Sequence, residues 1–148
     1  MSQLDPQQAE RWLALVMRLS GAILVLAFAA VLLPPAWMAW SHEKLGFGPL
    51  PETPVFEYLA RSISLLYGCR GVAYLLLARD IRRYLPVIAL FGWLDLVFGV
   101  AMLGIDLHAG MPWWWTAFEG PGLFVVGIIT LSLVFRVRAA QAADPSAT

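Results

Sequence analysis

Long apolar runs alternate along the chain with short segments that contain prolines, glycines and charged residues. Four runs are long enough to predict helices, with expected bounds at residues 12–33, 55–78, 84–107 and 118–135. A helix rises about 1.5 Å per residue, so about 20 residues cross a hydrocarbon core of about 30 Å. The fourth run reaches that length only if Trp113-Trp114-Trp115 and Phe118 extend its outer end. The pattern predicts an all-α integral membrane protein, a single domain over residues 1–148 with four transmembrane helices.

The composition agrees with a membrane protein. Hydrophobic residues make up 60% of the 148 residues and charged residues 14%, and the mean hydropathy is +0.72. A soluble domain averages about 45–50% apolar and about 25% charged residues. The net charge is zero and the longest run of basic residues in the chain is Arg82-Arg83, so nucleic acid is not an expected partner. The single cysteine excludes an intrachain disulfide and a cysteine-based metal cluster.

Basic residues gather at one end of the predicted bundle. They flank the start of the first run, fill the loop between the second and third runs, and follow the fourth: Arg11, Arg18, Arg79, Arg82, Arg83, Arg136 and Arg138. The opposite loops contain Lys44 as their one basic residue. The positive-inside rule therefore predicts an up-down-up-down bundle with both termini in the cytoplasm. Because the chain is short and rich in arginine and alanine, we expect a bacterial inner membrane.

The segments outside the runs are short, except for an outer loop over residues 34–54. Its mixture of aromatic residues, glycines and prolines predicts a surface connector with one short helix, or alternatively a cap over a pocket or a docking surface. Residues 139–148 are small and polar, and we expect them to fray. Ala27-Phe28-Ala29 is similar to a signal-peptide cleavage site, but Asp5 and Glu10 precede it, so the first run is predicted to stay in the mature protein.

Each predicted helix carries one stripe of small or polar residues at helical spacing. The glycines of these stripes are Gly21 in the first helix, Gly68 and Gly71 in the second, Gly92 and Gly99 in the third, and Gly120 and Gly127 in the fourth. Lipid provides no hydrophobic force that joins helices, so small residues that allow close approach mark the contacts. The stripes predict a tight bundle with little room for an aqueous channel.

Five ionisable residues lie within the predicted helices: Arg18, Glu57, Arg61, Arg70 and Asp95. A charged residue at the centre of a membrane helix costs about 2.5–3.5 kcal/mol on insertion scales, so each needs a reason to be there. Glu57 and Arg61 are four residues apart, in the favoured order for an intrahelical ion pair near the outer boundary. We interpret them as an interfacial pair that also holds the outer loop, or alternatively as a site for a substrate or a lipid headgroup.

Asp95 is the deepest acid in the predicted helices. A buried carboxylate needs a partner, and Arg70 and Arg18 both lie within reach by depth from the inner ends of their helices. The sequence predicts a structural Arg70–Asp95 or Arg18–Asp95 bridge, with a proton or ion relay or a contact to a partner subunit as alternatives. Arg70 points about a third of a turn away from the glycine stripe of its helix, which favours a contact outside that stripe.

The chain shows no motif for a cofactor or a metal, and none is predicted. His42 and His108 lie at the outer boundary, so they do not face each other within the helices as a bis-His haem requires. A zinc site that combines them with Glu43 and Asp106 is geometrically conceivable. Solvated loop residues explain the same pattern more simply, because the ligand spacing is nonspecific.

Two further residue types within the helices have a simple interpretation. Trp93 and Phe98 are interpreted as lipid-facing residues, with a site for a bound lipid, quinone or flat pigment as the alternative. Cys69 is interpreted as a small packing residue.

The sequence Arg18-Leu19-Ser20-Gly21 ahead of an apolar run resembles the first helix of the DoxX-like small membrane proteins. The chain length and the predicted layout of four helices are similar as well. The resemblance implies a four-helix fold and an accessory role in a redox membrane complex, and it assigns no catalytic residue.

Three functions are compatible with this pattern. We expect a noncatalytic accessory or structural subunit that packs against other membrane subunits, for example in a respiratory or photosynthetic complex. The alternative is a transporter or carrier of an ion or small molecule that uses Arg18, Arg70 and Asp95. A membrane enzyme acting on a lipid or quinone is a further alternative, but no nucleophile–base spacing is recognisable.

Overall fold

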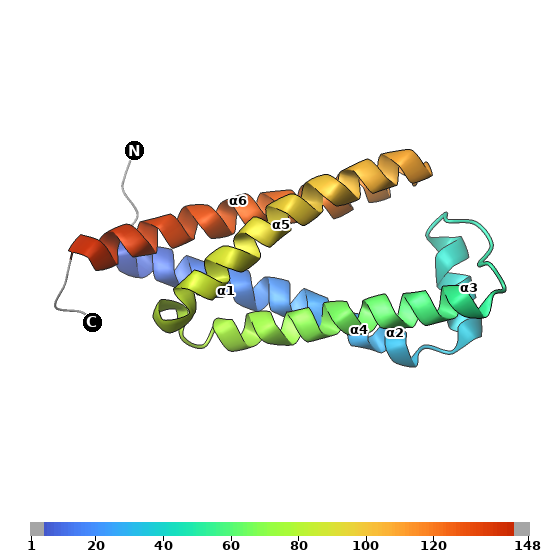
Figure 1. Cartoon of the computed structure of the whole chain (residues 1–148). Helices are drawn as coiled ribbons and strands as arrows, with labels where there is room; N and C mark the ends of the chain where they lie inside the picture. The colour runs from blue at the N-terminus through green and yellow to red at the C-terminus, as the bar shows by residue number, and fades with distance from the viewer. Residues whose placement is uncertain (1–4, 144–148) are drawn as a thin grey trace. The chain divides into compact units, whose positions relative to one another are not determined.

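The computed structural model describes residues 5–143. Over that range every regular element is a helix (Figure 1): α1 (Pro6–Val25), α2 (Ala27–Leu32), α3 (Pro35–Lys44), α4 (Pro54–Leu77), α5 (Ile81–Ala109) and α6 (Trp113–Ala143). The predicted all-α class is confirmed for the described residues. Helix α3 is the one short helix that was expected in the outer loop.

Three helical segments are long and apolar enough to cross a membrane: Pro6–Leu32, Ile81–Ala109 and Trp113–Ala143, with 27, 29 and 31 residues. Each spans about 40 Å or more at the helical rise, which exceeds a hydrocarbon core of about 30 Å. The segment Pro6–Leu32 consists of α1 and α2, which are separated only at Leu26. The chain is therefore a helical protein whose helices fit a membrane.

Helix α6 is longer than its predicted bounds of residues 118–135. It begins at Trp113, so the three tryptophans form its first turn, and it continues past Arg138 to Ala143. Residues 139–143, for which fraying was expected, continue α6 as helix, because alanine has the highest helix propensity. The rest of the predicted tail, residues 144–148, lies outside the described residues.

Helix α4 matches the predicted second span, residues 55–78, to within one residue at each end. Its 24 residues would span about 36 Å. It is nevertheless not among the helices that are apolar enough to cross a membrane. Glu57, Arg61 and Arg70 lower its hydropathy, so its crossing stays a prediction.

The ends of α5 are set by local sequence. Asp80 caps its first turn, because the carboxylate accepts a hydrogen bond of 3.1 Å from the Arg83 N–H. At the other end Gly110 adopts a left-handed conformation, with φ of 68°, and its N–H donates to the Asp106 carbonyl. Glycine adopts this conformation without steric cost, which ends the helix.

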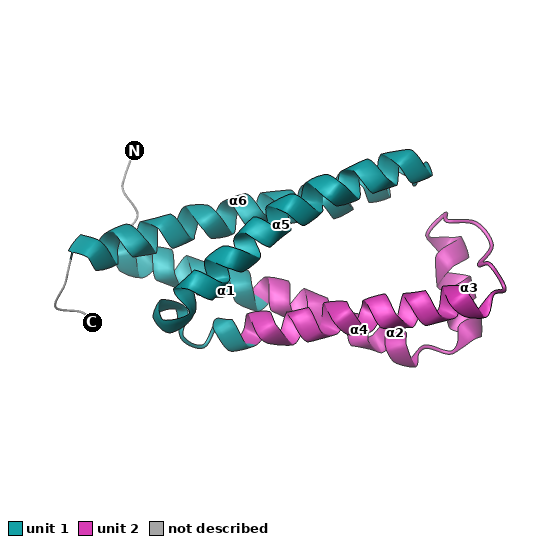
Figure 2. Cartoon of the chain, viewed as in Figure 1, with its two compact units in different colours: residues 1–18, 76–148 teal, residues 19–75 magenta. Residues whose placement is uncertain are grey.

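The chain divides into two compact units (Figure 2). Residues 1–18 and 76–148 belong to the first unit, and residues 19–75 form the second. In the first unit α5 and α6 pack side by side (Figure 1). Its apolar core contains residues at helical spacing from α1, α5 and α6: Ala9, Leu13, Met17, Ile81, Leu85, Ile88, Leu131, Val134 and Val137.

Glycines bring α5 and α6 into backbone contact within the first unit. A Cβ atom on Gly99 would lie 2.7 Å from the Gly120 carbonyl oxygen, and one on Gly120 would lie 2.7 Å from the Gly99 carbonyl oxygen. Gly92 and Gly127 sit along the same seam, since a Cβ on Gly127 would meet the Gly92 carbonyl oxygen at 2.9 Å. The predicted small-residue contact between these helices is confirmed.

The second unit contains an equivalent seam between the end of α1 and α4. A Cβ atom on Gly71 would lie 2.8 Å from the Gly21 carbonyl oxygen and 2.7 Å from the Val25 nitrogen. The Phe28 ring of α2 lies directly over Gly68. The stripes predicted for these two helices therefore meet at their glycines.

Replacing Gly99 by alanine should destabilise the α5–α6 pair. The added methyl group would overlap backbone atoms of α6, which cannot rotate away, and overpacking of this kind costs about 1–3 kcal/mol. Thermal denaturation of the purified chain in detergent measures the effect. Gly104→Ala, on the same helix, is the matched control, because nothing lies within 4 Å of a Cβ at that position. Equal midpoints for the two variants would contradict the close contact.

Candidate functional site

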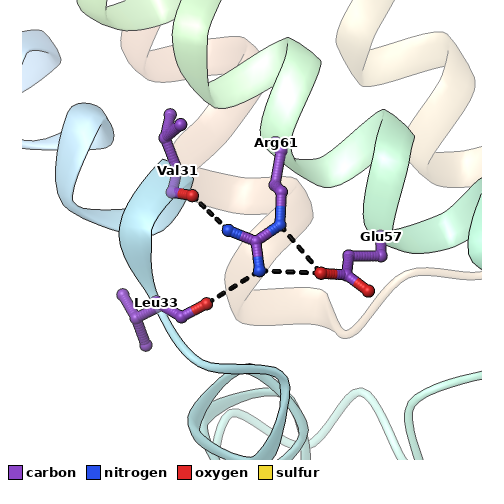
Figure 3. A network of polar contacts seen from close by, with 4 residues as sticks. All are labelled: Val31, Leu33, Glu57 and Arg61. Carbon is purple, nitrogen blue, oxygen red and sulfur yellow. Dashed lines mark hydrogen bonds and ion pairs between the residues drawn. The ribbon is translucent and has the colours of Figure 1, made fainter.

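The first two turns of α4 carry an ion pair. The Arg61 guanidinium donates two hydrogen bonds to one Glu57 carboxylate oxygen, 2.9 Å from Nε and 2.7 Å from Nη2. The spacing of four residues places both side chains on one face of the helix (Figure 3). Both side chains are partly exposed, so the pair by itself adds little stability.

The same guanidinium reaches across to the end of α2. It donates to the Val31 carbonyl through Nη1 and to the Leu33 carbonyl through Nη2, the latter at 3.0 Å (Figure 3). Carbonyls at the end of a helix lack intrahelical donors, and the following Pro34 and Pro35 have no N–H to offer. Arg61 therefore supplies the missing donors. The expected Glu57–Arg61 pair is formed, and its arginine holds the end of α2 just before the outer loop, while its place at the membrane interface stays a prediction.

The outer loop is organised around His42. Its Nδ1 lies 2.9 Å from the Gly48 carbonyl oxygen, so Nδ1 carries the proton and donates. The imidazole also contacts the rings of Phe47, at 5.2 Å between centroids, and Phe56, at 5.7 Å. His42 is thus partly exposed and contacts two aromatic rings, and its interpretation as a solvated residue stays a prediction.

A cavity of about 500 Å³ lies beside this loop, between α3, the segment before α4 and the first turn of α4. Glu57 lines it together with Met38 and Phe56. Two acidic residues, Glu52 and Glu57, thus line a cavity whose other lining residues are mainly apolar.

Arg70 donates a hydrogen bond of 3.0 Å to the hydroxyl of Tyr74, one turn further along α4. Tyr74 is buried, so this bond satisfies a hydroxyl that water does not reach. The predicted Arg70–Asp95 bridge joins residues of the two units and stays a prediction.

Asp95 is 1% exposed and lies on the face of α5 that carries Gly92 and Gly99. The alternative Arg18–Asp95 bridge is not formed. Arg18 is exposed and lines a cleft with the α4–α5 turn, because it shares its face of α1 with Arg11 and Ala14.

Sequence reasoning named Asp106 only as a conceivable zinc ligand and did not predict the polar group that lies where α5 ends and α6 begins. Trp115 donates from its indole nitrogen to Glu119, and the Asp106 carboxylate lies close enough to Glu119 for their charges to interact. Asp106 is only 3% exposed, and its Oδ2 atom has no hydrogen-bond partner among the described residues. The sequence does contain a signal for this group. Asp106 follows Asp95 by eleven residues, so the two acids lie on the same face of the helix.

The exposure of two single residues in α4 and α5 bears on their interpretation. Cys69 is exposed on α4 and is not the packing residue that was predicted. Trp93 is exposed on α5, which agrees with its interpretation as a lipid-facing residue. Within residues 5–143, no group of three His, Cys, Asp or Glu side chains is placed to hold a metal ion.

The fold and these polar contacts define a small helical protein with membrane-compatible helices and structural polar clusters at its helix ends. No protein-family model, curated protein or solved structure matches the chain. The DoxX-like resemblance accordingly stays a prediction.

Replacing Arg61 by leucine should destabilise the protein, because the Val31 and Leu33 carbonyls would lose their donors. Each buried group left unsatisfied costs about 1–3 kcal/mol. Glu57→Gln is the matched control: the amide oxygen still accepts from Arg61, and the carbonyl contacts remain. We expect a much lower thermal midpoint in detergent for Arg61→Leu and a small change for Glu57→Gln. A larger loss in Glu57→Gln would show that the ion pair matters more than the carbonyl contacts.

Proposed function

We propose that this chain is a noncatalytic accessory subunit of a larger membrane complex in a bacterial inner membrane, anchored by four helices with both termini in the cytoplasm. Respiratory and photosynthetic complexes are proposed hosts. The main support is how little of each apolar segment the chain itself covers. The buried share of the most apolar stretch is 11% in Pro6–Leu32, 28% in Ile81–Ala109 and 33% in Trp113–Ala143. Most of the helical surface is thus available to lipid or to other subunits.

The polarity of α4 favours protein neighbours over lipid alone. A helix with three charged residues inserts poorly by itself. Contacts to other helices reduce that cost, because polar groups can then be satisfied by protein instead of facing hydrocarbon. A host complex would supply such contacts on the outer surface of α4.

The arrangement of the first unit supports an even number of crossings. Residues of the α1 start, the α5 start and the α6 end line one cavity of about 250 Å³, among them Glu10, Arg82 and Gln141. The start of α1 and the start of α5 are therefore at the same end of that unit. If α1 and α2 cross the membrane, the chain must cross back before α5 begins. Helix α4 is the only helix between them with sufficient length, since α3 has 10 residues.

Cysteine labelling tests this topology. In a Cys69→Ser background, single cysteines at Ala39 in α3 and at Ala142 near the end of α6 should label from opposite sides of the membrane. The expected result is reaction of Ala39→Cys with an impermeant maleimide in intact cells, and reaction of Ala142→Cys only after permeabilisation. Labelling of both from outside would contradict a cytoplasmic C-terminus. The variant Glu10→Cys distinguishes four crossings from three. With four crossings, its cysteine should react only after permeabilisation, as that of Ala142→Cys does.

Extraction from native membranes tests the subunit proposal. The chain, tagged at its C-terminus, should co-migrate with a larger complex in mild detergent, with partner subunits at stoichiometric amounts by mass spectrometry. An absorption spectrum of the same fraction identifies a haem or pigment of the host. A lone monomer or homodimer would contradict the proposal. The alternative is then an ion carrier that uses the buried acids Asp95 and Asp106 on one face of α5. Loss of ion flux into vesicles that contain the Asp106→Asn variant would support this alternative.

A further inference from the structure

A cleft of about 400 Å³ lies between the first half of α1 and the α4–α5 turn, entirely within the first unit. Four of its lining residues are arginines: Arg11, Arg18, Arg79 and Arg82. The two arginines of α1 are seven residues apart, which places them two turns apart on one helical face. Four guanidinium groups that converge on one cleft favour an anionic ligand.

The acids in this cleft do not neutralise it. Glu10 forms an ion pair with Arg82 at 2.9 Å, and the Asp80 carboxylate accepts from the Arg83 N–H as the cap of α5. Both acids are therefore already engaged. The guanidinium groups of Arg11, Arg18 and Arg79 have no ion-pair or hydrogen-bond partner among residues 5–143. The four arginines and two acids leave a net charge of about +2 in the cleft.

The position of the cleft indicates what kind of anion it meets. It lies where two membrane-compatible segments, Pro6–Leu32 and Ile81–Ala109, begin. Trp12 and Leu15, on α1 beside the arginines, are large apolar residues that are exposed. A tryptophan at this level is typical of the headgroup region of a bilayer. The surface thus combines guanidinium groups with adjacent apolar contacts, as a phospholipid requires.

We propose that this cleft binds the phosphate group of an anionic phospholipid. The guanidinium forks of Arg11, Arg18 and Arg79 donate to the phosphate oxygens, a geometry that arginine matches in pairs of parallel hydrogen bonds. The acyl chains then lie along the exposed apolar surface beside Trp12 and Leu15. Basic pockets at the ends of membrane helices bind lipid headgroups in this way. Free phosphate has the same oxyanion chemistry but makes no use of the apolar surface. The site does not depend on whether the chain is a subunit or a carrier.

Native mass spectrometry of the full chain in mild detergent tests the proposal. The probes are phosphatidylglycerol and phosphatidylcholine, which share the phosphodiester and the acyl chains but differ in net charge. We expect phosphatidylglycerol to bind at least tenfold more tightly than phosphatidylcholine. The variant R11Q/R79Q should lose most of this preference. The matched control R136Q/R138Q removes the same charge from exposed arginines of α6 outside the cleft, and it should keep the preference within about twofold.

Three further measurements make the result decisive. If R11Q/R79Q does not fold, R11K/R79K and the single variant R18Q replace it, and both should bind phosphatidylglycerol more weakly than the native chain. Inorganic phosphate at millimolar concentration distinguishes the two sources of the anion. Stabilisation of the chain by phosphate, with no preference for phosphatidylglycerol, would overturn the lipid assignment. Equal loss of preference in the cleft variant and the α6 control would overturn the site, because the effect would then follow net charge alone.

Discussion

The absence of water in a bilayer core is the constraint on which this structure depends. Every backbone carbonyl there must find a donor inside the protein, and an irregular segment between two helices leaves several carbonyls without one. A comparable shortage of donors arises in a partly exposed region at the end of α2, because the nitrogens of the following Pro34 and Pro35 carry no hydrogen. Arg61 resolves it by donating to two carbonyls at once, while Glu57 holds the guanidinium in position. A residue on α4 thereby completes the hydrogen bonding at the end of α2, where the outer loop begins.

Close packing is the second requirement, because lipid is as apolar as the side chains it would replace. Helices gain stability there mainly through dispersion contacts and close approach of their backbones. The chain achieves this with paired glycines in both units, Gly99 with Gly120 and Gly21 with Gly71. At each pair the two backbones approach so closely that a methyl group would overlap the neighbour. The seam between α5 and α6 is therefore filled, which disfavours a water path along it.

Local features could be predicted from the sequence, and features that join distant segments could not. The helices, their glycine faces and the Glu57–Arg61 pair all follow from spacings within one helix. The Glu10–Arg82 ion pair joins residues 72 positions apart, so no local pattern reports it, and the arginine cleft depends on the same approach of α1 to the α4–α5 turn. The length of α6 was underestimated because hydropathy was used to place its ends, whereas helix propensity extends it through polar residues.

The distribution of charge along the helices favours contacts at their ends and outer surfaces over chemistry inside them. Arg11, Arg18 and Arg79 lie in the cleft where α1 and α5 begin, and the Asp106–Glu119 pair lies where α5 ends and α6 begins. Between these ends the α5–α6 seam contains Asp95 in a closely packed surrounding. A carrier needs a chain of polar steps through the membrane, and the described seam interrupts such a chain with backbone contacts at glycines. The proposed accessory subunit requires a rigid anchor and outward-facing surfaces, and the packed seams and largely uncovered helices are compatible with both.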